Sequence, residues 1–241
     1  MLAEGKNPVK EALNSGVTIE KILVLDKVSD PIVREIVKQA RDKGVRVEFV
    51  QKQAIDRLSE TGHHQGIIAV TSEFKYSDLK DVISEAKNKE ERMFFVLLDK
   101  LSDPHNLGSI IRTAECSSVT AVVIPARNSV LVNETVVRTS MGATSHVKVC
   151  KVGNLNDAIN TLKDEGVFIY VTDMDGDNIY KTNLKGHIGI VVGSEGNGVS
   201  SLTRKLADQV ISIPMYGKIN SLNASVSAGI CMYEAVRQEK F

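Results

Sequence analysis

Three polar loops in the carboxyl-terminal part of the chain carry the residues whose types and spacing could do chemistry. They read D-P-H-N-L-G-S-I-I-R from Asp103, G-S-E-G-N-G from Gly193 and M-Y-G-K-I-N-S-L-N-A-S from Met215. Glycines such as Gly193 and Gly198 leave backbone N–H and C=O groups uncovered, so a ligand can be held by main chain alone. The loops therefore predict a small-molecule pocket, placed late in the chain.

The second loop does not match the common nucleotide-binding motifs. A P-loop needs Gly-Lys-Ser/Thr, and a dinucleotide fingerprint needs G-x-G-x-x-G with an acidic residue about 20 positions further on. A carboxylate at Glu195, beside a predicted helix N-terminus, would repel phosphate and suit a cationic or hydroxyl-rich ligand. The glycines alone are equally compatible with a tight strand-to-helix turn.

The first and third loops add polar side chains. Asn106 is predicted as the N-cap of a helix, and Arg112 follows about one and a half turns later, where its forked donors could grip a phosphate. Ser221 is predicted to cap the final helix, which places Asn223 in the first turn. Capping explains these residues as well as a ligand site does at this point.

The histidines give weaker signals. His63 and His64 precede Gln65 and Gly66, and no third ligand lies at a familiar metal-site spacing, so we expect no metal. A solvated loop is the simpler interpretation, with RNA contact as the functional alternative. We expect His105 to belong to loop structure rather than to act as a general base.

Strands and helices alternate in a way that positions the three loops. From Met93 onward, apolar runs predict strands at 94–98, 120–124, 147–150, 167–172, 188–192 and 210–214. Helical patterns lie around 107–118, 134–142, 154–165, 199–207 and 222–238. The runs lack polar alternation, which predicts a mostly parallel sheet with helices on both sides. Ligands bind beyond the carboxyl ends of such strands, where the three loops lie.

The first 72 residues predict a separate small α/β domain. Helices are expected at 8–15, 30–43 and 51–58, and strands at 19–25, 45–50 and 66–70. Residues 73–92 are polar and carry charge clusters, so we predict a linker leading into a helix. The second domain is then expected to span residues 93–241.

Composition sets broad limits on partners and compartment. The chain has 241 residues, with 30 basic and 30 acidic side chains, so any nucleic-acid contact must use local patches. Cys116, Cys150 and Cys231 are widely spaced in apolar surroundings, which favours buried reduced thiols and a cytoplasmic location. The amino terminus lacks an apolar signal region, and no run is long enough for a membrane helix.

The three loops, taken in order, closely resemble the motifs of SpoU-type (TrmH-like) RNA ribose 2′-O-methyltransferases, the SPOUT class of S-adenosylmethionine enzymes. The matching segments are D-P-H-N-L-G-S-I-I-R-T-A-E, I-V-V-G-S-E-G-N-G-V, and I-S-I-P-M with S-L-N-A-S-V-S-A-G-I, within residues 93–241. Residues 1–72, with G-K-N-P-V-K-E-A-L and H-Q-G-I, resemble the L30e-like substrate-binding domain of several members. The whole is most similar to the rRNA guanosine-2′-O-methyltransferase branch.

This resemblance implies a homodimeric α/β domain with a carboxyl-terminal trefoil knot, although connections in proteins are normally unknotted. It implies S-adenosylmethionine as the cofactor and RNA as the partner, most simply rRNA, with no DNA or membrane partner. By motif matching, the cofactor-binding residues are Gly193, Gly198, Ile213, Met215 and Leu222. The catalytic residues are Asn106, Arg112, Glu195, Ser221 and Asn223.

The implied chemistry suits these residue types. A sulfonium methyl group is already a strong electrophile, so the enzyme must mainly position a ribose hydroxyl in line with it and help remove a proton, without a metal. A guanidinium stays protonated in proteins, so we expect Arg112 to clamp phosphate and ribose and to stabilise developing oxyanion charge. Asn106 and Asn223 would orient neighbours, Ser221 would position its loop, and Glu195 would hold Arg112 or Asn106.

Recognition of RNA is assigned to the first domain. It holds eleven Lys and Arg against ten Asp and Glu, so we expect recognition by shape and a local patch. The alternatives are a tRNA 2′-O-methyltransferase, an enzyme for another rRNA nucleotide, and a catalytically silent RNA-binding or ribosome-assembly protein. A nucleotide-dependent dehydrogenase is disfavoured by the missing fingerprint. The sequence does not identify the methylated nucleotide.

Overall fold

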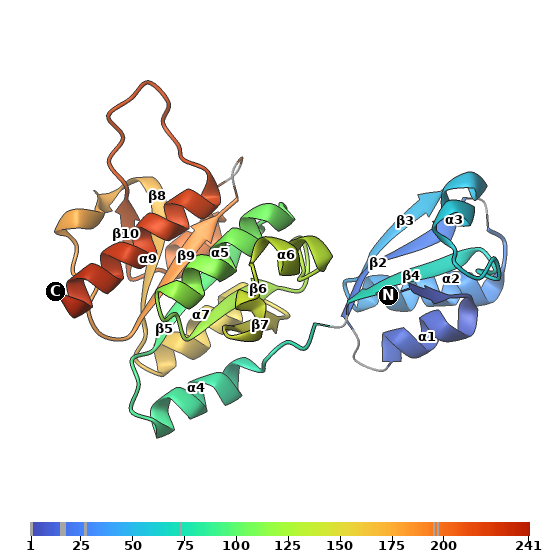
Figure 1. Cartoon of the computed structure of the whole chain (residues 1–241), viewed down its shortest axis with the longest axis horizontal. Helices are drawn as coiled ribbons and strands as arrows, with labels where there is room; N and C mark the ends of the chain where they lie inside the picture. The colour runs from blue at the N-terminus through green and yellow to red at the C-terminus, as the bar shows by residue number, and fades with distance from the viewer. Residues whose placement is uncertain (1, 15–17, 27, 73, 195, 197) are drawn as a thin grey trace. The chain divides into compact units, whose positions relative to one another are not determined.

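The chain folds into two compact units, Met1–Lys75 and Tyr76–Phe241, in the computed structural model. The structure describes residues 2–14, 18–26, 28–72, 74–194, 196 and 198–241. Each unit is built around its own sheet with helices packed on it (Figure 1). The predicted fold class, a small α/β domain followed by a domain with a parallel sheet, is confirmed.

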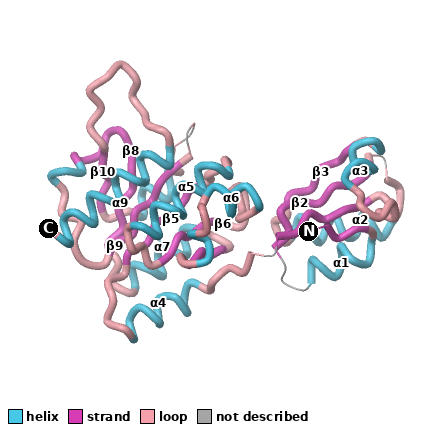
Figure 2. The backbone as a smooth tube through the Cα atoms, viewed as in Figure 1, coloured by secondary structure: helices cyan, strands magenta, loops and turns pink. Residues whose placement is uncertain are grey.

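The first unit contains a four-stranded sheet with the order β1-β4-β2-β3. Strand β4 runs antiparallel to β1 and β2, whereas β2 and β3 are parallel. Strand β3 lies at an edge of the sheet (Figure 2). The elements are β1 Leu2–Glu4, α1 Lys6–Asn14, β2 Thr18–Leu25, α2 Pro31–Asp42, β3 Arg46–Val50, α3 Lys52–Leu58 and β4 Ile67–Ser72.

Helix α2 shows why the first unit folds as it does. Asp30 caps it by accepting a hydrogen bond from the Ile32 N–H at 2.9 Å, and Pro31 occupies the first helical position. Lys6 Nζ lies 2.5 Å from Asp30 Oδ2 and ties the start of α1 to this cap. The residues of α2 that face the core share one side of the helix and are Val33, Ile36, Val37 and Ala40.

Strand β1 was not predicted from the sequence. It has only three residues, too few to show the alternation by which a strand is recognised. It exists because Leu2–Glu4 pairs antiparallel with β4, with Leu2 opposite Val70 and Glu4 opposite Ile68. The pairing is long-range and leaves no local signal.

The second unit contains a six-stranded, fully parallel sheet with the order β10-β8-β9-β5-β6-β7. All six predicted strands are present, as β5 Phe94–Asp99, β6 Ala121–Pro125, β7 Lys148–Val152, β8 Phe168–Asn178, β9 Ile188–Gly193 and β10 Gln209–Ser212. The α-helices are α4 Leu79–Asn88, α5 Pro104–Cys116, α6 Glu134–Thr139, α7 Leu155–Asp164, α8 Ser201–Leu206 and α9 Ala224–Lys240. Two short 3-10 helices span Ala143–Ser145 and Ile179–Lys181.

Helices cover both faces of this sheet, as predicted. One core cluster joins side chains of α4 and α7 to Phe95 and Leu97 of the central strand β5. Phe94, Val96 and Leu98 alternate with them and are equally buried, so they are covered from the opposite face. Figure 1 shows α5 and α9 side by side on that face.

Residues 73–92, predicted as a linker leading into a helix, are in large part integrated into the second unit. Helix α4 buries its apolar side chains in the core of that unit. Before it, the Ser77 N–H donates to the Val149 carbonyl at 2.9 Å, and the Val132 N–H donates to the Tyr76 hydroxyl at 2.8 Å. The boundary between the compact units therefore falls at Lys75 and Tyr76.

The central pair of strands sets the place where the loops meet. Strands β5 and β9 are direct neighbours, and their last residues, Asp99 and Gly193, lie opposite each other. From β5 the chain continues to one side of the sheet, through β6 and β7, whereas β9 borders β8 on the other side. Such a switch point is where ligands bind in open parallel sheets.

The three cysteines differ in their surroundings. Cys150 and Cys231 are buried, and burial raises the pKa of each thiol to about 12. Cys116 is exposed, so the expectation of three buried thiols is wrong for this residue. Cys116 lies on the exposed side of α5. Its apolar neighbours in the sequence did not indicate on which side of the helix it would lie. Among the described helices, none has the length and apolarity to cross a membrane.

Candidate active site

The chain turns back sharply as soon as β9 ends at Gly193. Ser194 and Gly198 exchange two backbone hydrogen bonds, of 3.1 and 2.9 Å, and Gly198 has a φ of 61°. A Cβ atom on Gly193 would lie 2.2 Å from the carbonyl carbon of Gly198. Gly193 is therefore required because the returning limb of the turn passes directly against its Cα. The predicted pair Gly193 and Gly198 is brought together.

Asp99 fixes the far side of this turn. Its Oδ2 accepts a hydrogen bond from the Ser200 N–H at 2.8 Å, and the residue is only 4% exposed. Ser200 in turn caps α8, and the Thr203 hydroxyl of that helix donates to Asn156 Oδ1 at 2.9 Å. Sequence reasoning missed Asp99, although a carboxylate that ends an apolar strand at the ligand-binding edge was an available signal.

Helix α5 begins at the neighbouring position on the sheet edge. Asp103 is its N-cap and accepts from the His105 N–H at 2.9 Å, with Pro104 at the first helical position. The prediction that Asn106 is the N-cap is wrong, because the Asp-Pro pair before it starts the helix three residues earlier. Asn106 instead lies in the first turn, 5% exposed.

Gly108 lets α6 approach the start of α5. A Cβ atom there would lie 2.6 Å from Thr139 Cβ and 2.9 Å from the Val136 carbonyl oxygen. The His105 ring, which is exposed, lies 3.5 Å from the Thr139 hydroxyl through Nδ1. His105 thus lies in the first turn of α5, not in a loop as expected, and it contacts α6 there.

Arg112 is exposed, whereas Asn106 is buried. The two residues are six positions apart, which in an α-helix separates them by about 120° around the axis and about 9 Å along it. They therefore leave different faces of α5, and one helix does not bring them together. Arg112 projects outward from the layer formed by α5 and α9.

Asn223 is the N-cap of α9. Its Oδ1 accepts hydrogen bonds from the Ser225 N–H at 2.9 Å, the Val226 N–H at 3.4 Å and the Ser225 hydroxyl at 2.6 Å. The prediction that Ser221 caps the helix and Asn223 lies in its first turn is wrong by two residues. Both side chains are polar and short, and the backbone at Asn223, with ψ of 144°, is extended as a cap requires.

Helices α5 and α9 run parallel, so their N-termini lie at the same end. Thr113 Cγ2 lies 3.8 Å from the Cβ position of Gly229, and the Ser117 hydroxyl lies 3.5 Å from Met232 Sδ. The contacts advance together along both helices. The first turn of α5, with Asn106, is thereby placed at the same end as the Asn223 cap of α9.

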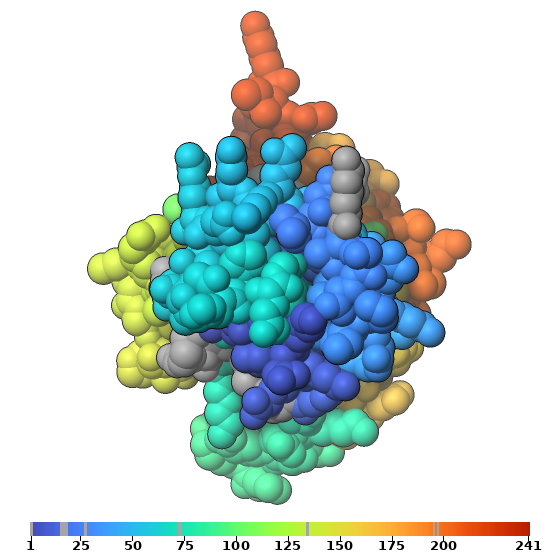
Figure 3. Space-filling model, turned by 90° about the vertical axis from the view of Figure 1, so that its right-hand side faces the viewer, coloured from blue at the N-terminus to red at the C-terminus, as the bar shows by residue number. Residues whose placement is uncertain are grey.

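Residues 213–222, between β10 and α9, form a long loop that projects from the second unit (Figures 1 and 3). Ile213 is half-buried at its base, while Met215 and Leu222 are 37% and 38% exposed. Ser221 is exposed, and Tyr216 is 95% exposed. A loop with so many uncovered apolar side chains is typical of a surface that contacts a ligand or partner.

Glu195 lies outside the described residues. Ser194, Gly196 and Gly198, which are near it in sequence, are described. Among the described residues, no group of three His, Cys, Asp or Glu side chains is arranged to hold a metal. The described edge thus offers uncovered backbone, two helix N-termini and a long loop.

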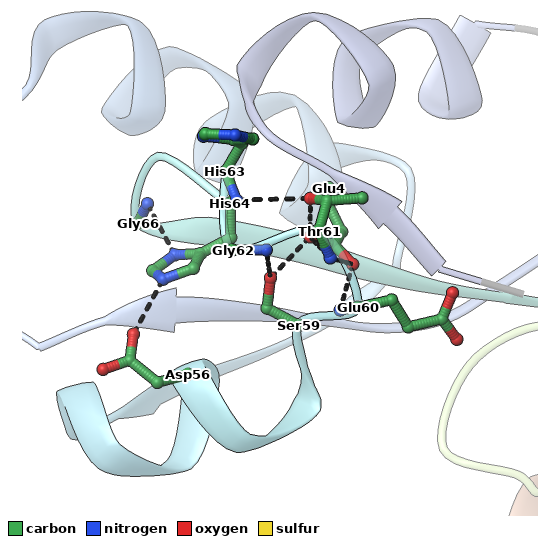
Figure 4. Close-up of polar contacts among 9 residues, drawn as sticks. All are labelled: Glu4, Asp56, Ser59, Glu60, Thr61, Gly62, His63, His64 and Gly66. Atoms are coloured by element: carbon green, nitrogen blue, oxygen red, sulfur yellow. Dashed lines mark hydrogen bonds and ion pairs between the residues drawn. The ribbon is translucent and has the colours of Figure 1, made fainter.

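The histidine-bearing loop of the first unit is a second polar cluster (Figure 4). His64 Nδ1 accepts from the Gly66 N–H at 3.0 Å, so Nε2 carries the proton and donates to Asp56 Oδ1 at 2.9 Å. Both ring nitrogens of His64 are used within the domain, whereas the neighbouring His63 is exposed. His64 is therefore structural, and His63 is the ring that can meet a partner.

Glu4 anchors the same loop to β1. It accepts hydrogen bonds from the Ser59 hydroxyl at 2.6 Å, the Thr61 hydroxyl at 2.5 Å and the Glu60 N–H at 2.6 Å. These donors, the hydroxyls foremost, lower the pKa of Glu4 to about 2. Its ionised carboxylate holds the loop in the shape that presents His63.

Comparisons with protein families divide the chain in a similar way. A model described as the SpoU rRNA Methylase family matches residues 93–233. A second, described as RNA 2'-O ribose methyltransferase substrate binding, matches residues 2–77.

Individual proteins are similar over most of the chain. A protein of Staphylococcus saprophyticus that bears the name of a TrmH family tRNA/rRNA methyltransferase is 42% identical over 238 residues, 98% of this chain and 95% of the relative. The AdoMet-bound rRNA methyltransferase of Sinorhizobium meliloti has a TM-score of 0.62 at 24% identity, covering 98% of this chain and 86% of that one. A TrmH/SpoU tRNA modifying enzyme of A. aeolicus has a TM-score of 0.56 at 28% identity, covering 66% and 83%.

Proposed function

This chain belongs to the SpoU rRNA methylase family of RNA methyltransferases, and we propose that it transfers the methyl group of S-adenosylmethionine to a ribose 2′-hydroxyl of RNA. The observation that carries the proposal is the meeting of three features at one sheet edge. The narrow turn at Gly193 lies beside Asp99 at the switch point, and the parallel helices α5 and α9 both begin at one end.

The cofactor is assigned to the turn and the projecting loop. Gly196 and Gly198 are exposed in the turn, so main-chain groups outside the two hydrogen bonds between Ser194 and Gly198 can bind the polar parts of S-adenosylmethionine without side chains. Ile213, Met215 and Leu222 supply apolar surface on the loop that leads to α9. The relative from S. meliloti was crystallised with AdoMet, which supports this assignment.

For this reaction the protein must orient the ribose hydroxyl toward the methyl group, more than supply side chains that react with either of them. The cofactor brings an electrophilic methyl group, and the protein must align the ribose hydroxyl and accommodate its proton. Asn106, beside the α5 N-terminus, orients neighbouring groups, and Asn223 holds the start of α9 in place. Glu195 and Ser221 complete the proposed constellation.

Arg112 is proposed as the clamp on RNA phosphate and ribose. Its exposure on α5 keeps the guanidinium available, and a planar fork binds phosphate through two parallel hydrogen bonds. An Arg112→Lys variant keeps the charge and loses the fork, so we expect methyl transfer to fall at least about tenfold at every pH. Near-normal turnover of this variant would remove the clamp from the mechanism.

We place the target on a guanosine of large-subunit rRNA. The matched family model is described by rRNA, and the rRNA methyltransferase of S. meliloti covers 98% of this chain, first unit included. The tRNA modifying enzyme of A. aeolicus matches only 66% of the chain. A tRNA target is the second candidate, because the S. saprophyticus relative is named for both substrates.

The first unit is proposed to recognise the RNA. The family model that matches residues 2–77 is described by substrate binding, and the unit is compact in itself. Sequence-specific recognition of RNA mostly targets single-stranded loops and bulges, so we expect a target in a loop or an irregular element. If a variant without residues 1–75 kept both rRNA affinity and site choice, recognition would belong to the second unit.

The active form is proposed to be a cytoplasmic homodimer with a carboxyl-terminal trefoil knot. The chain returns from the edge strand β10 to pack α9 on α5, which is compatible with such threading. Val226 and Tyr233 on α9 are 49% and 52% exposed, with the half-buried Ile230 between them on the same side of the helix. This apolar stripe lies beside α5 and would be covered by a second copy.

A further inference from the structure

A pocket of about 420 Å³ opens in the first unit, whereas the candidate active site is built from residues of the second unit. It is lined by residues of α2, the end of β2, Val28 and the edge strand β3, so it belongs entirely to this unit. The residues that define it chemically are Val33, Val37, Arg34, Lys38, Arg41 and Phe49.

The floor of the pocket is apolar and its wall is aromatic. Val33 and Val37 are buried beneath it, while Phe49 on β3 is 52% exposed. An exposed phenyl ring on an edge strand leaves apolar area in water, and it offers a flat face to a planar ligand. The ring is thus placed as a stacking surface.

The rim is cationic. Arg34, Lys38 and Arg41 follow one another at helical spacing along α2, which places them on one side of the helix. The Arg41 guanidinium lies over the Phe49 ring, 5.9 Å from its centre. In the described part of the chain, neither Arg34 nor Lys38 forms an ion pair. One carboxylate, Asp42, also lines the pocket, so cations outnumber anions there.

We propose that this pocket is a subsite for single-stranded RNA, in which a base stacks on Phe49 and the flanking phosphates pair with Arg34, Lys38 and Arg41. The proposal rests on the RNA methyltransferase function and specifies where the first unit grips its substrate. An aromatic face beside a basic track is the combination by which proteins bind single strands with little sequence preference. It is distinct from the His63 loop, which is built on β1 and α3.

The absence of tryptophan from this chain allows a direct test. The Phe49→Trp variant of the full-length protein would carry a single indole in the pocket, retaining a stacking face. We expect its fluorescence to be quenched, with saturation, when a single-stranded RNA of about 12 nucleotides binds. The matched control is Ile32→Trp, since Ile32 is 50% exposed on the same helix outside the pocket lining, and its emission should stay unchanged.

Loss of the ring and loss of the charges have separate expected effects. Phe49→Ala should weaken RNA binding roughly tenfold, because stacking of one base on an aromatic ring is lost. A plot of log affinity against log salt concentration has a negative slope. Changing Arg34, Lys38 and Arg41 to Gln should make this slope less steep by about 0.7 for each phosphate contact removed. Lys10→Gln, at an exposed lysine on α1, is the control for each single Gln substitution, because it removes one positive charge outside the pocket.

Three outcomes would overturn the subsite. One is RNA binding by anisotropy with unchanged emission of the Phe49→Trp variant. Another is quenching of that variant by an acidic peptide and not by RNA, which would make the pocket a protein-docking site. The third is failure of the full-length protein to bind RNA. Binding of S-adenosylmethionine and methyl transfer by the unaltered protein are measured in parallel, so failure of the enzyme function is told apart from failure of the subsite.

Discussion

Gly193, at the end of β9, has no side chain, and this allows the next loop to fold back against its Cα. The turn that follows Gly193 packs its returning limb 2.2 Å from where a Cβ would stand. The adjacent Asp99 carboxylate holds the chain after the turn through the Ser200 N–H. Together they fix the backbone surface that is proposed to bind the cofactor.

Replacing Gly193 by Ala should therefore damage the site selectively. The added methyl group must displace the backbone of Gly198, and overpacking of this kind costs about 1–3 kcal/mol. We expect affinity for S-adenosylmethionine, measured by calorimetry, to fall at least about tenfold. Gly196→Ala is the matched control, because a Cβ there meets nothing within 4 Å. Equal affinities of the two variants would contradict the assigned role of the turn.

The residue types predicted which segments contain the candidate residues, but they predicted the role of each side chain less well. Asn106 and Ser221 were expected as caps, yet Asp103 and Asn223 perform that function. Neighbouring Asp, Asn and Ser residues are all suitable N-caps. Which of them caps the helix depends on where the backbone leaves the sheet. Asp99 was missed because its partner, Ser200, is remote in sequence.

At the level of elements, capping and catalysis can be separated at Asn223. Its side chain satisfies the N–H groups of Ser225 and Val226, so Asn223→Ala should lower the free energy of unfolding by about 1 kcal/mol. Asn223→Ser should restore most of that stability, since Ser also caps. If the amide has an additional role in methyl transfer, activity should stay low in the Ser variant.

Ser221→Ala provides the control for this comparison. Ser221 precedes the cap and is exposed, so its replacement should leave the unfolding free energy within about 0.5 kcal/mol of the unaltered protein. A loss of stability as large as that of Asn223→Ala would show that the cap had been assigned to the wrong residue.

The loop held by Glu4 should make the first unit sensitive to acid. Hydrogen bonds from Ser59 and Thr61 lower the pKa of Glu4 from 4.5 to about 2. A lowered folded pKa contributes stability that is fully present above the unfolded value and is lost as the pH falls from about 4.5 towards 2.

This pH dependence is tested by comparing the unaltered protein with Glu4→Gln. The unaltered protein should have the higher thermal midpoint at pH 7, and the difference should vanish near pH 2. Comparing the two proteins removes the contribution of Glu85, whose pKa is also lowered to about 2, in its case by Lys148 and Lys89. A difference that stayed constant across this range would exclude ionisation of Glu4 as its source.

The regular elements of the second unit were predictable because burial on both faces produces long apolar runs. The six strands followed from that pattern, and the helices between them followed from helical periodicity. The linker was only partly predictable, since α4 has a polar composition but buries one side against the core of the second unit. Strand β1 was not predictable, because pairing with β4 supplies its stability.

At the scale of the whole molecule, the outer side of α9 is expected to join two copies. Tyr233 and Val226 are half exposed, and association would remove them from water. We predict that Tyr233→Glu shifts the protein to monomers in sedimentation equilibrium and lowers methyl transfer, because a carboxylate would be buried in the interface. Tyr180→Glu is the control, with an equally exposed ring on another part of the unit. A monomeric unaltered protein would contradict this prediction directly.

Nucleoside mass spectrometry of the product shows whether the protein transfers a methyl group to a ribose hydroxyl. The purified protein is incubated with S-adenosylmethionine and unmodified large-subunit rRNA, with tRNA in a parallel reaction, and each RNA is digested to nucleosides. We predict 2′-O-methylguanosine from the rRNA, with the methyl group on the sugar fragment, and a strongly reduced yield with Gly193→Ala. A methyl group found on the base, with an unmodified ribose, would contradict the account.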